Sequence, residues 1–214
     1  MPYPSLAILH ADDALIVADK PAGLLSIPAS GADRQDCLVS RVQACYPDAL
    51  VVHRLDMATS GLILLGRGAE MQRRLNLAFA QRVVGKHYLA LVHGHLPDDA
   101  GEIDLPLGED PHDRPRQRVE PLCGRRALTR WRVLERSGAG ERRLSRVELQ
   151  PLTGRTHQLR VHLMAIGHPI VGDPLYGPVQ GGGPDARLHL HAARLALIHP
   201  RTRIPVCFES PVPF

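Results

Sequence analysis

The stretch Val51 to Leu65, VVHRLDMATSGLILL, contains the residues of this chain best suited to chemistry. A single acid, Asp56, lies between Arg54 and the turn-forming residues 59–61 (TSG). An ordinary aspartate is ionised at neutral pH, and a neighbouring arginine favours that form. An ionised carboxylate can attack an electrophilic carbon directly. The alternative is that Asp56 is a turn residue whose side chain accepts hydrogen bonds from nearby backbone amides, and the stretch alone leaves both interpretations open.

Other common chemistries have weaker support in the sequence. Two pairs of histidines have His-X-His spacing, which places both side chains of a pair on one strand face: His93 with His95, and His189 with His191. Neither pair has an evident third ligand, and no cysteine cluster indicates a zinc site. The chain has no GxSxG motif, P-loop or dinucleotide-binding pattern, and Asp56 has no obvious second carboxylate of the kind that glycosidases use. A single carboxylate among cations is what remains.

The basic residues are distributed unevenly. The formal net charge is +4, and of the 26 basic residues 24 are arginine, so Lys20 and Lys86 are the two lysines. Between Arg114 and Arg146 there are 11 arginines and three acids, a surplus of eight positive charges. Such a density indicates a polyanion partner, although a solvated strand face in an arginine-biased protein is an equal alternative on charge alone. Combined with a lone carboxylate, a nucleic-acid surface predicts covalent chemistry on a nucleotide.

Length and composition restrict the class of protein. The 214 residues, 44% hydrophobic and 22% charged, are typical of a soluble globular protein with one large domain or two small ones. No apolar run approaches the roughly 18 residues of a membrane span, and the first residues lack a signal-peptide pattern. The four cysteines are well separated, so we expect free thiols and a cytoplasmic location.

The hydrophobic pattern predicts the elements that position Asp56. Two buried strands, at Val51-Val52 and Leu62 to Leu65, are expected on either side of its loop. Further strands are expected at residues 6–9, 15–18, 83–94, 101–107, 125–135, 143–150 and 188–198. Helices are expected at residues 69–81 and 156–166, with a short one between 33 and 46, and a flexible loop at 178–184. Strands outnumber helices and several connections are hairpin-sized, which predicts an α+β fold with a largely antiparallel sheet.

Four segments resemble, in the right order, the motifs of the RluA-type pseudouridine synthases. HRLDMATSG (53–61) resembles the family signature. The other three are KPAG (20–23), KHYLA (86–90) and LTGRTHQLR (152–160), the last followed by GHPIVGDPLYG (167–177). LHAARLALIHP (190–200) resembles a segment near the C-terminus of the family. The resemblance covers essentially the whole chain, and each of the two lysines lies in a motif.

This resemblance implies a fold and an activity. The fold would be α+β, the pseudouridine synthase fold, with a mixed, mainly antiparallel sheet around a central catalytic cleft and flanking helices. The activity would be isomerisation of uridine in RNA to pseudouridine without cofactor or metal. In that reaction the base is detached from the sugar at N1, turned, and rejoined through C5. A stacked uridine must first be flipped out, at a cost of a few kcal/mol.

The resemblance also assigns roles to four residues. Asp56 matches the catalytic aspartate, and the sequence leaves open whether it attacks the sugar C1′, adds to C6 of the base, or abstracts a sugar proton. Tyr88 matches the tyrosine that stacks on the target base, and Arg155 the arginine that pairs with the aspartate. Arg54 matches a position implicated in displacing the base from its stack. The alternatives are that Tyr88 is a core strand residue, Arg155 a helix-start cation and Arg54 a surface charge.

Within the family, the chain most resembles the dual-specificity branch. We expect a single catalytic domain over residues 1–214 without the S4-type RNA-binding domain of other members, because the first motif begins at Lys20. The expected partners are RNA substrates, a tRNA anticodon-loop uridine and a 23S rRNA hairpin-loop uridine, with no obligatory protein partner and no membrane. Two alternatives stay open: a synthase acting on 23S rRNA only, and an inactive RNA-binding or chaperone protein on the same fold.

Overall fold

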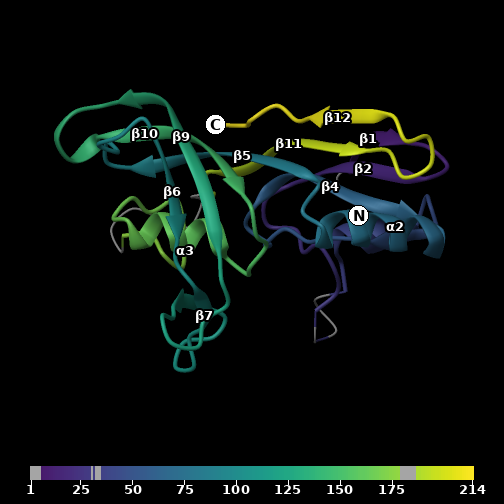
Figure 1. Ribbon diagram of the computed structural model, residues 1–214, viewed down its shortest axis with the longest axis horizontal. Helices are drawn as coiled ribbons and strands as arrows, with labels where there is room; N and C mark the ends of the chain where they lie inside the picture. Colours follow the sequence, from purple (N-terminus) through teal and green to yellow (C-terminus); the bar gives the residue numbers. More distant parts are fainter. Residues whose placement is uncertain (1–5, 30, 32–34, 179–186) are drawn as a thin grey trace. The chain divides into compact units, whose positions relative to one another are not determined.

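A computed structural model of the chain describes residues 6–29, 31, 35–178 and 187–214 (Figure 1). The chain forms two compact units. The first unit comprises Met1–Lys86 and His191–Pro213, and the second comprises His87–Leu190 with Phe214. Each unit combines strands with helices, which confirms the predicted α+β class.

The first unit is built on the strand order β1-β2-β4-β11. Its strands are β1 (Ala7–Ala11), β2 (Leu15–Lys20), β3 (Ala49–Val51), β4 (Ser60–Arg67), β11 (Leu190–Ile198) and β12 (Pro205–Glu209). β3 pairs with β4, and β12 pairs with β11. These pairings are antiparallel apart from β4 with β11, which run parallel over two residue pairs. The sheet is therefore mixed and mainly antiparallel, as predicted.

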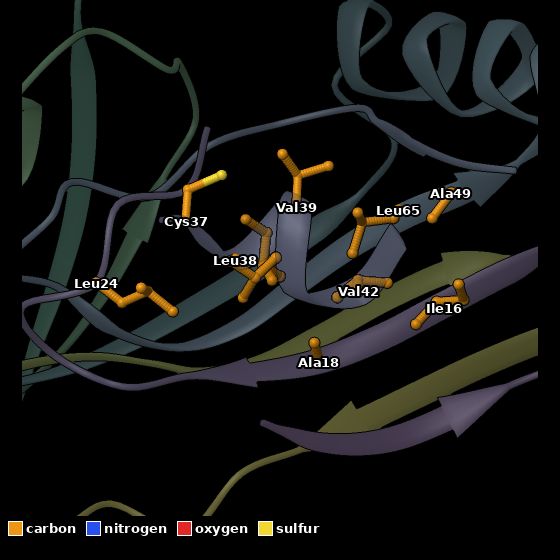
Figure 2. Packing of buried hydrophobic residues seen from close by; sticks show 10 residues of the cluster. Ile16, Ala18, Leu24, Cys37, Leu38, Val39, Val42, Ala49 and Leu65 are labelled. Carbon is orange, nitrogen blue, oxygen red and sulfur yellow. The ribbon is translucent and has the colours of Figure 1, made fainter. Parts of the chain in front are cut away.

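Strands β2 and β4 are covered on both faces. Helix α1 (Leu38–Gln43) packs on one face, and helix α2 (Gly68–Ala80) contributes to the cluster on the other. Figure 2 shows the first cluster, in which Leu38 and Val42 of α1 lie close to Ile16, Ala18 and Leu65 of the strands. The alternate strand residues Leu15, Val17, Leu62 and Leu64 pack in the second cluster with Leu75 of α2. Because neither face is exposed to water, the sequences of both strands are largely continuous apolar runs rather than alternating apolar and polar residues.

The second unit is built on an antiparallel sheet with the strand order β5-β10-β9-β6. These strands are β5 (Gly85–His93), β6 (Ala100–Asp104), β9 (Leu128–Ser137) and β10 (Leu144–Pro151). A separate two-stranded sheet pairs β7 (Leu107–Glu109) with β8 (Gln117–Val119), and a short 3-10 helix, η2, spans Gly140–Arg142. Helix α3 (Gln158–Ala165) packs Val161 against Leu107, Ala127 and Tyr176.

The predicted helices and the strands around Asp56 are confirmed, and the short strands were missed. Strand β12 was not predicted because it is a mostly exposed edge strand that begins with a proline. Strands β7 and β8 have three residues each, which is too short for a hydrophobic period to be visible. The predicted strand over 101–107 was wrong at its end, since β6 stops at Asp104. Most of the expected loop at 178–184 lies outside the described residues. In the described ranges, no helix combines the length and the apolar character that crossing a membrane requires.

Candidate active site

The loop between β3 and β4, residues 52–59, carries Asp56 and Arg54 in the first unit. The Asp56 side chain is half-buried, the Arg54 side chain is exposed, and Leu55 between them is buried. The turn is closed by the backbone, since the N–H of Thr59 donates to the carbonyl of Asp56 at 3.1 Å. The structure therefore presents a carboxylate and a guanidinium from one short loop. The loop ends at the buried strand β4 as predicted, whereas β3 before it is mostly half-buried and stops at Val51, so that Val52 belongs to the loop.

Ser26 fixes the residue directly before Asp56. Its hydroxyl donates to the carbonyl of Leu55 at 2.7 Å and lies 3.1 Å from the backbone N–H of Leu55, which donates to it. Ser26 is buried, so these bonds are made away from water. Both backbone polar groups of Leu55 are thus held by one side chain, which restricts the direction in which the chain enters Asp56.

Lys20 fixes the residue directly after Asp56. The carbonyl of Met57 accepts from the backbone N–H of Gly23 at 2.8 Å and from Lys20 Nζ at 3.0 Å. The same Nζ donates to two further carbonyls, those of Pro21 (2.9 Å) and Leu24 (2.8 Å). Lys20 has no exposed surface. Burial lowers its pKa to about 7, while the negative charge of Asp56 raises it. Three carbonyl acceptors match the three N–H groups of an ammonium, so the hydrogen bonds favour the charged form.

His53 anchors the beginning of the loop. Its Nε2 accepts the backbone N–H of Leu64 at 2.9 Å, which requires an unprotonated Nε2 and hence a neutral ring. The ring stacks on Phe79 of α2 with centroids 4.7 Å apart. Burial, together with the charge of Lys86, lowers the pKa of His53 to about 3. The ring is therefore neutral at physiological pH.

Gly61 allows β4 to start directly after the loop. Its φ is +109°, a conformation that side-chain-bearing residues rarely adopt. A Cβ at this position would lie 2.4 Å from the carbonyl oxygen of Ala192 in β11. Glycine is therefore required on two counts, backbone conformation and close approach.

Tyr88 and Arg155 both lie in the second unit. Tyr88 is a half-buried residue of β5 and faces Leu149 of β10 in the sheet register. Arg155 is half-buried in the turn between β10 and α3, and its Nε donates to the carbonyl of Arg126 at 3.0 Å. Gln158 holds this turn: its Oε1 accepts the backbone N–H of Arg155 at 3.0 Å. Each of the four predicted site residues thus has a defined place within its own unit.

The arginine-rich region, residues 114–146, is less positive than its own sequence indicates. Seven of its 11 arginines form ion pairs with acids, at positions 114, 116, 118, 126, 130, 132 and 136. Most of these acids lie outside the region, for example Glu102 and Asp104 on β6. Exposed pairs of this kind are worth at most about 1 kcal/mol each, so a phosphate can compete for the arginine. The surface therefore has basic groups available to a polyanion, although its local net charge is smaller than the segment count.

Three residues that hold the Asp56 loop were not assigned this function from the sequence. In the sequence, Lys20 was noted as one of two lysines and as the first residue of a family-like motif, whereas in the structure it ends β2 and bonds three carbonyls. Ser26 gave no signal in the sequence at all. His53 lies within the family-like signature, but nothing in its spacing indicated a bond to Leu64 eleven residues later.

Comparisons with known proteins identify the family of this chain. A family model described as RNA pseudouridylate synthase matches residues 14–165. The chain belongs to the RNA pseudouridylate synthase family. It is 46% identical over 211 residues to "Dual-specificity RNA pseudouridine synthase RluA" of Pasteurella multocida (strain Pm70), covering 99% of this chain and 95% of that protein. Identity to the protein of the same name from Yersinia pestis is 42%, over 98% of this chain and 100% of the relative.

Solved structures show the same fold. The chain is similar to human RNA Pseudouridylate Synthase Domain Containing 1 with a TM-score of 0.82 and 31% identity, over 98% of this chain and 84% of the other. For human RNA Pseudouridylate Synthase Domain Containing 4 the TM-score is 0.75 and the identity 27%, over 96% and 88% of the two chains. The synthase is therefore an isomerase that converts uridine in RNA to pseudouridine.

We expect the synthase to lose stability in acid partly because of His53. In the unfolded chain a histidine binds a proton near pH 6.5, whereas folded His53 stays neutral down to about pH 3. The unfolded state thus gains a proton first, so stability falls as pH drops through this window, by up to about 1.4 kcal/mol per pH unit. His53→Gln keeps an acceptor for the Leu64 N–H and removes the titration. Urea unfolding between pH 7 and 4 should show a smaller loss for this variant than for the wild type.

The matched control is His112→Gln, which changes an exposed histidine. It should follow the wild-type curve at every pH. Parallel curves for His53→Gln and the wild type would contradict the prediction, because they would mean that His53 titrates equally in the folded and unfolded states.

Proposed function

We propose that Asp56 is the catalytic group of this synthase and that its substrates are structured loops of both tRNA and 23S rRNA. The observation that carries the first part is the rigid attachment on both sides of Asp56. Ser26 holds Leu55, while Gly23 and Lys20 hold the carbonyl of Met57. A reacting carboxylate that is fixed before substrate binds needs no ordering in the transition state, which is a large part of what positioning contributes to rate.

Positive charges lie near Asp56. The buried amine of Lys20 interacts with Asp56 through space, and Arg54 lies two residues before Asp56 in the same loop. All three routes in this family require an ionised carboxylate, the ordinary state of an aspartate at neutral pH: attack at C1′, addition at C6, or abstraction of a sugar proton.

Arg54 is suited to displacing the target base. Its side chain is exposed, while the residues on either side of it, His53 and Leu55, are attached to Leu64 and Ser26. An exposed guanidinium on a rigid support can occupy the space that a flipped base leaves and can contact phosphates. To Tyr88 and Arg155 we assign the roles that the family resemblance implies, an aromatic partner for the flipped base and a cation for the aspartate.

Similarity along nearly the whole chain supports the choice of RNA. The relatives from Pasteurella multocida and Yersinia pestis, both named dual-specificity synthases, are matched over 95% and 100% of their own lengths. The proposed substrates are a uridine of the tRNA anticodon loop and a uridine of a 23S rRNA hairpin loop, and no protein partner is required. Unstacked loop bases of this kind are recognised by shape and by stacking.

Asp56→Asn should abolish catalysis. Formation of the new bond at C5 releases the hydrogen of that carbon, so tritium from C5-labelled uridine in an anticodon stem-loop measures turnover. We expect release to fall by at least roughly a thousandfold with RNA affinity retained, because the amide is neither a nucleophile nor a base. Asp13→Asn, which neutralises an exposed aspartate of the same unit, is the control and should turn over normally. Full tritium release by Asp56→Asn would remove Asp56 from the mechanism.

Mapping pseudouridine in a strain that lacks the gene tests the choice of substrates. We expect one site to disappear from the anticodon loop of certain tRNAs and one from a 23S rRNA hairpin, and both to return when the wild-type gene is supplied. Loss of rRNA sites alone would make this a 23S-specific enzyme. A gene encoding Asp56→Asn is the control that separates the modification from any other effect of the protein.

RNA affinity should fall steeply with salt if the arginine-rich region holds phosphates. Each phosphate contact adds roughly 0.7 to 0.9 to the slope of log affinity against log salt. Neutralising three exposed arginines for which no ion pair is recorded among the described side chains, Arg125, Arg142 and Arg143, should lower that slope by up to about 2 to 3. The control is the triple change Arg73, Arg201 and Arg203 to Gln, which removes the same charge outside the region. Equal slopes for the two triple variants would mean that the arginine-rich region is solvated surface and does not hold phosphates.

A further inference from the structure

A chain of hydrogen bonds links the end of the Asp56 loop to three other parts of the first unit. Ser60 Oγ lies 2.9 Å from His191 Nδ1, His191 Nε2 lies 3.0 Å from Ser210 Oγ, and Ser210 Oγ donates to Asp19 Oδ2 at 2.7 Å. The side chains of Ser60, His191 and Ser210 are 4%, 2% and 6% exposed, so the chain runs through the interior. None of its members belongs to the site described above.

The direction of these hydrogen bonds follows from the Asp19 end. The only hydroxyl hydrogen of Ser210 is donated to the Asp19 carboxylate, so Ser210 must accept from His191, and His191 Nε2 carries a proton. In a neutral ring Nδ1 is then unprotonated, and it accepts a hydrogen bond from the hydroxyl of Ser60. Asp19 thereby sets the tautomer of His191, and His191 sets the orientation of the Ser60 hydroxyl.

The position of Ser60 gives this chain a consequence for Asp56. Ser60 follows Thr59, whose N–H closes the turn on the carbonyl of Asp56. Strand β4 begins at Ser60 and runs parallel to β11 over only two residue pairs, Ser60 with His191 and Gly61 with Ala192. The Ser60–His191 bond joins the side chains of the first of these pairs and so adds a side-chain link to a short backbone ladder.

We propose that His191, acting through Ser60, is a positioning residue that holds the Asp56 loop in its reactive conformation. Ser26 and Lys20 fix the residues on either side of Asp56, and His191 binds the side chain of Ser60 at the end of the loop. The inference rests on the proposed role of Asp56, since a loop without a reacting group would need no such precision.

The test separates the two nitrogens of His191. An asparagine amide reaches about as far as Nδ1 and a glutamine amide about as far as Nε2, so His191→Asn keeps a partner for Ser60 and His191→Gln keeps one for Ser210. Single-turnover rates at saturating enzyme, RNA dissociation constants and unfolding midpoints are measured for both variants and for Ser60→Ala. We expect Ser60→Ala and His191→Gln to be at least about tenfold slower with RNA affinity within twofold of wild type, and His191→Asn to recover most of the rate. The double variant Ser60→Ala/His191→Gln should be no slower than the slower single variant, because both remove the same bond.

A merely structural histidine gives a different pattern. The two His191 variants would then be slowed equally, in proportion to the fall in their unfolding midpoints, or would not be slowed at all. Ser60→Ala would turn over at the wild-type rate. Either result overturns the proposal. Should the His191 variants fail to fold, Ser60→Ala decides alone, since it removes a single oxygen atom. The Asp56→Asn variant separates the proposed function from the role of His191. An active Asp56→Asn variant contradicts both. An inactive Asp56→Asn variant together with a normal Ser60→Ala variant contradicts only the role of His191.

Discussion

The buried ammonium of Lys20 is the interaction on which the arrangement of the first unit depends. An unpaired ammonium in the interior is strongly unfavourable, and here three backbone carbonyls compensate for the lost water. Those carbonyls come from the turn after β2 and from the loop after Asp56, where Met57 lies 37 residues from Lys20 in the sequence. A compact ammonium with three diverging donors fits such a cage, whereas the planar guanidinium of arginine does not. In a chain with 24 arginines, this geometry explains why a lysine stands at position 20.

The consequence for function is that the backbone on either side of Asp56 is held in place. The loop of Asp56 is attached at His53 to β4, at Leu55 to Ser26 and at Met57 to Lys20 and Gly23. Between these attachments Asp56 keeps a half-buried side chain and Arg54 an exposed one. A rigid backbone around the reacting side chain is what a site needs when the substrate must be unstacked before it can react, because binding energy is then available for the deformation of the RNA rather than for ordering the protein.

Two sets of positive charges have different electrostatic effects, the single lysine near Asp56 and the arginine-rich region. Close to Asp56, the charge of one buried lysine acts with little screening, since water is excluded around it. Over the arginine-rich region, seven of 11 arginines have acidic partners, so the field there is weaker than a count along the segment indicates. Such exposed pairs exchange readily with phosphates, which makes the region adaptable to RNA without a large fixed potential. At Lys86, burial and the charge of Arg82 lower the pKa.

The amino-acid sequence was sufficient to predict the class of fold, the strands around Asp56 and the family, because apolar runs and contiguous motifs consist of residues that are neighbours in the sequence. It also led to the four proposed site residues, although only through resemblance to the family. Ser26, His53 and His191 needed the tertiary structure, since their partners lie 29, 11 and 131 residues away and no period or spacing relates them. The same holds for the acids Glu102, Asp104 and Glu148, which pair with arginines from other strands or segments. Hydrogen bonds and ion pairs act over a few ångströms in space, and only the folded chain decides which groups come within that distance.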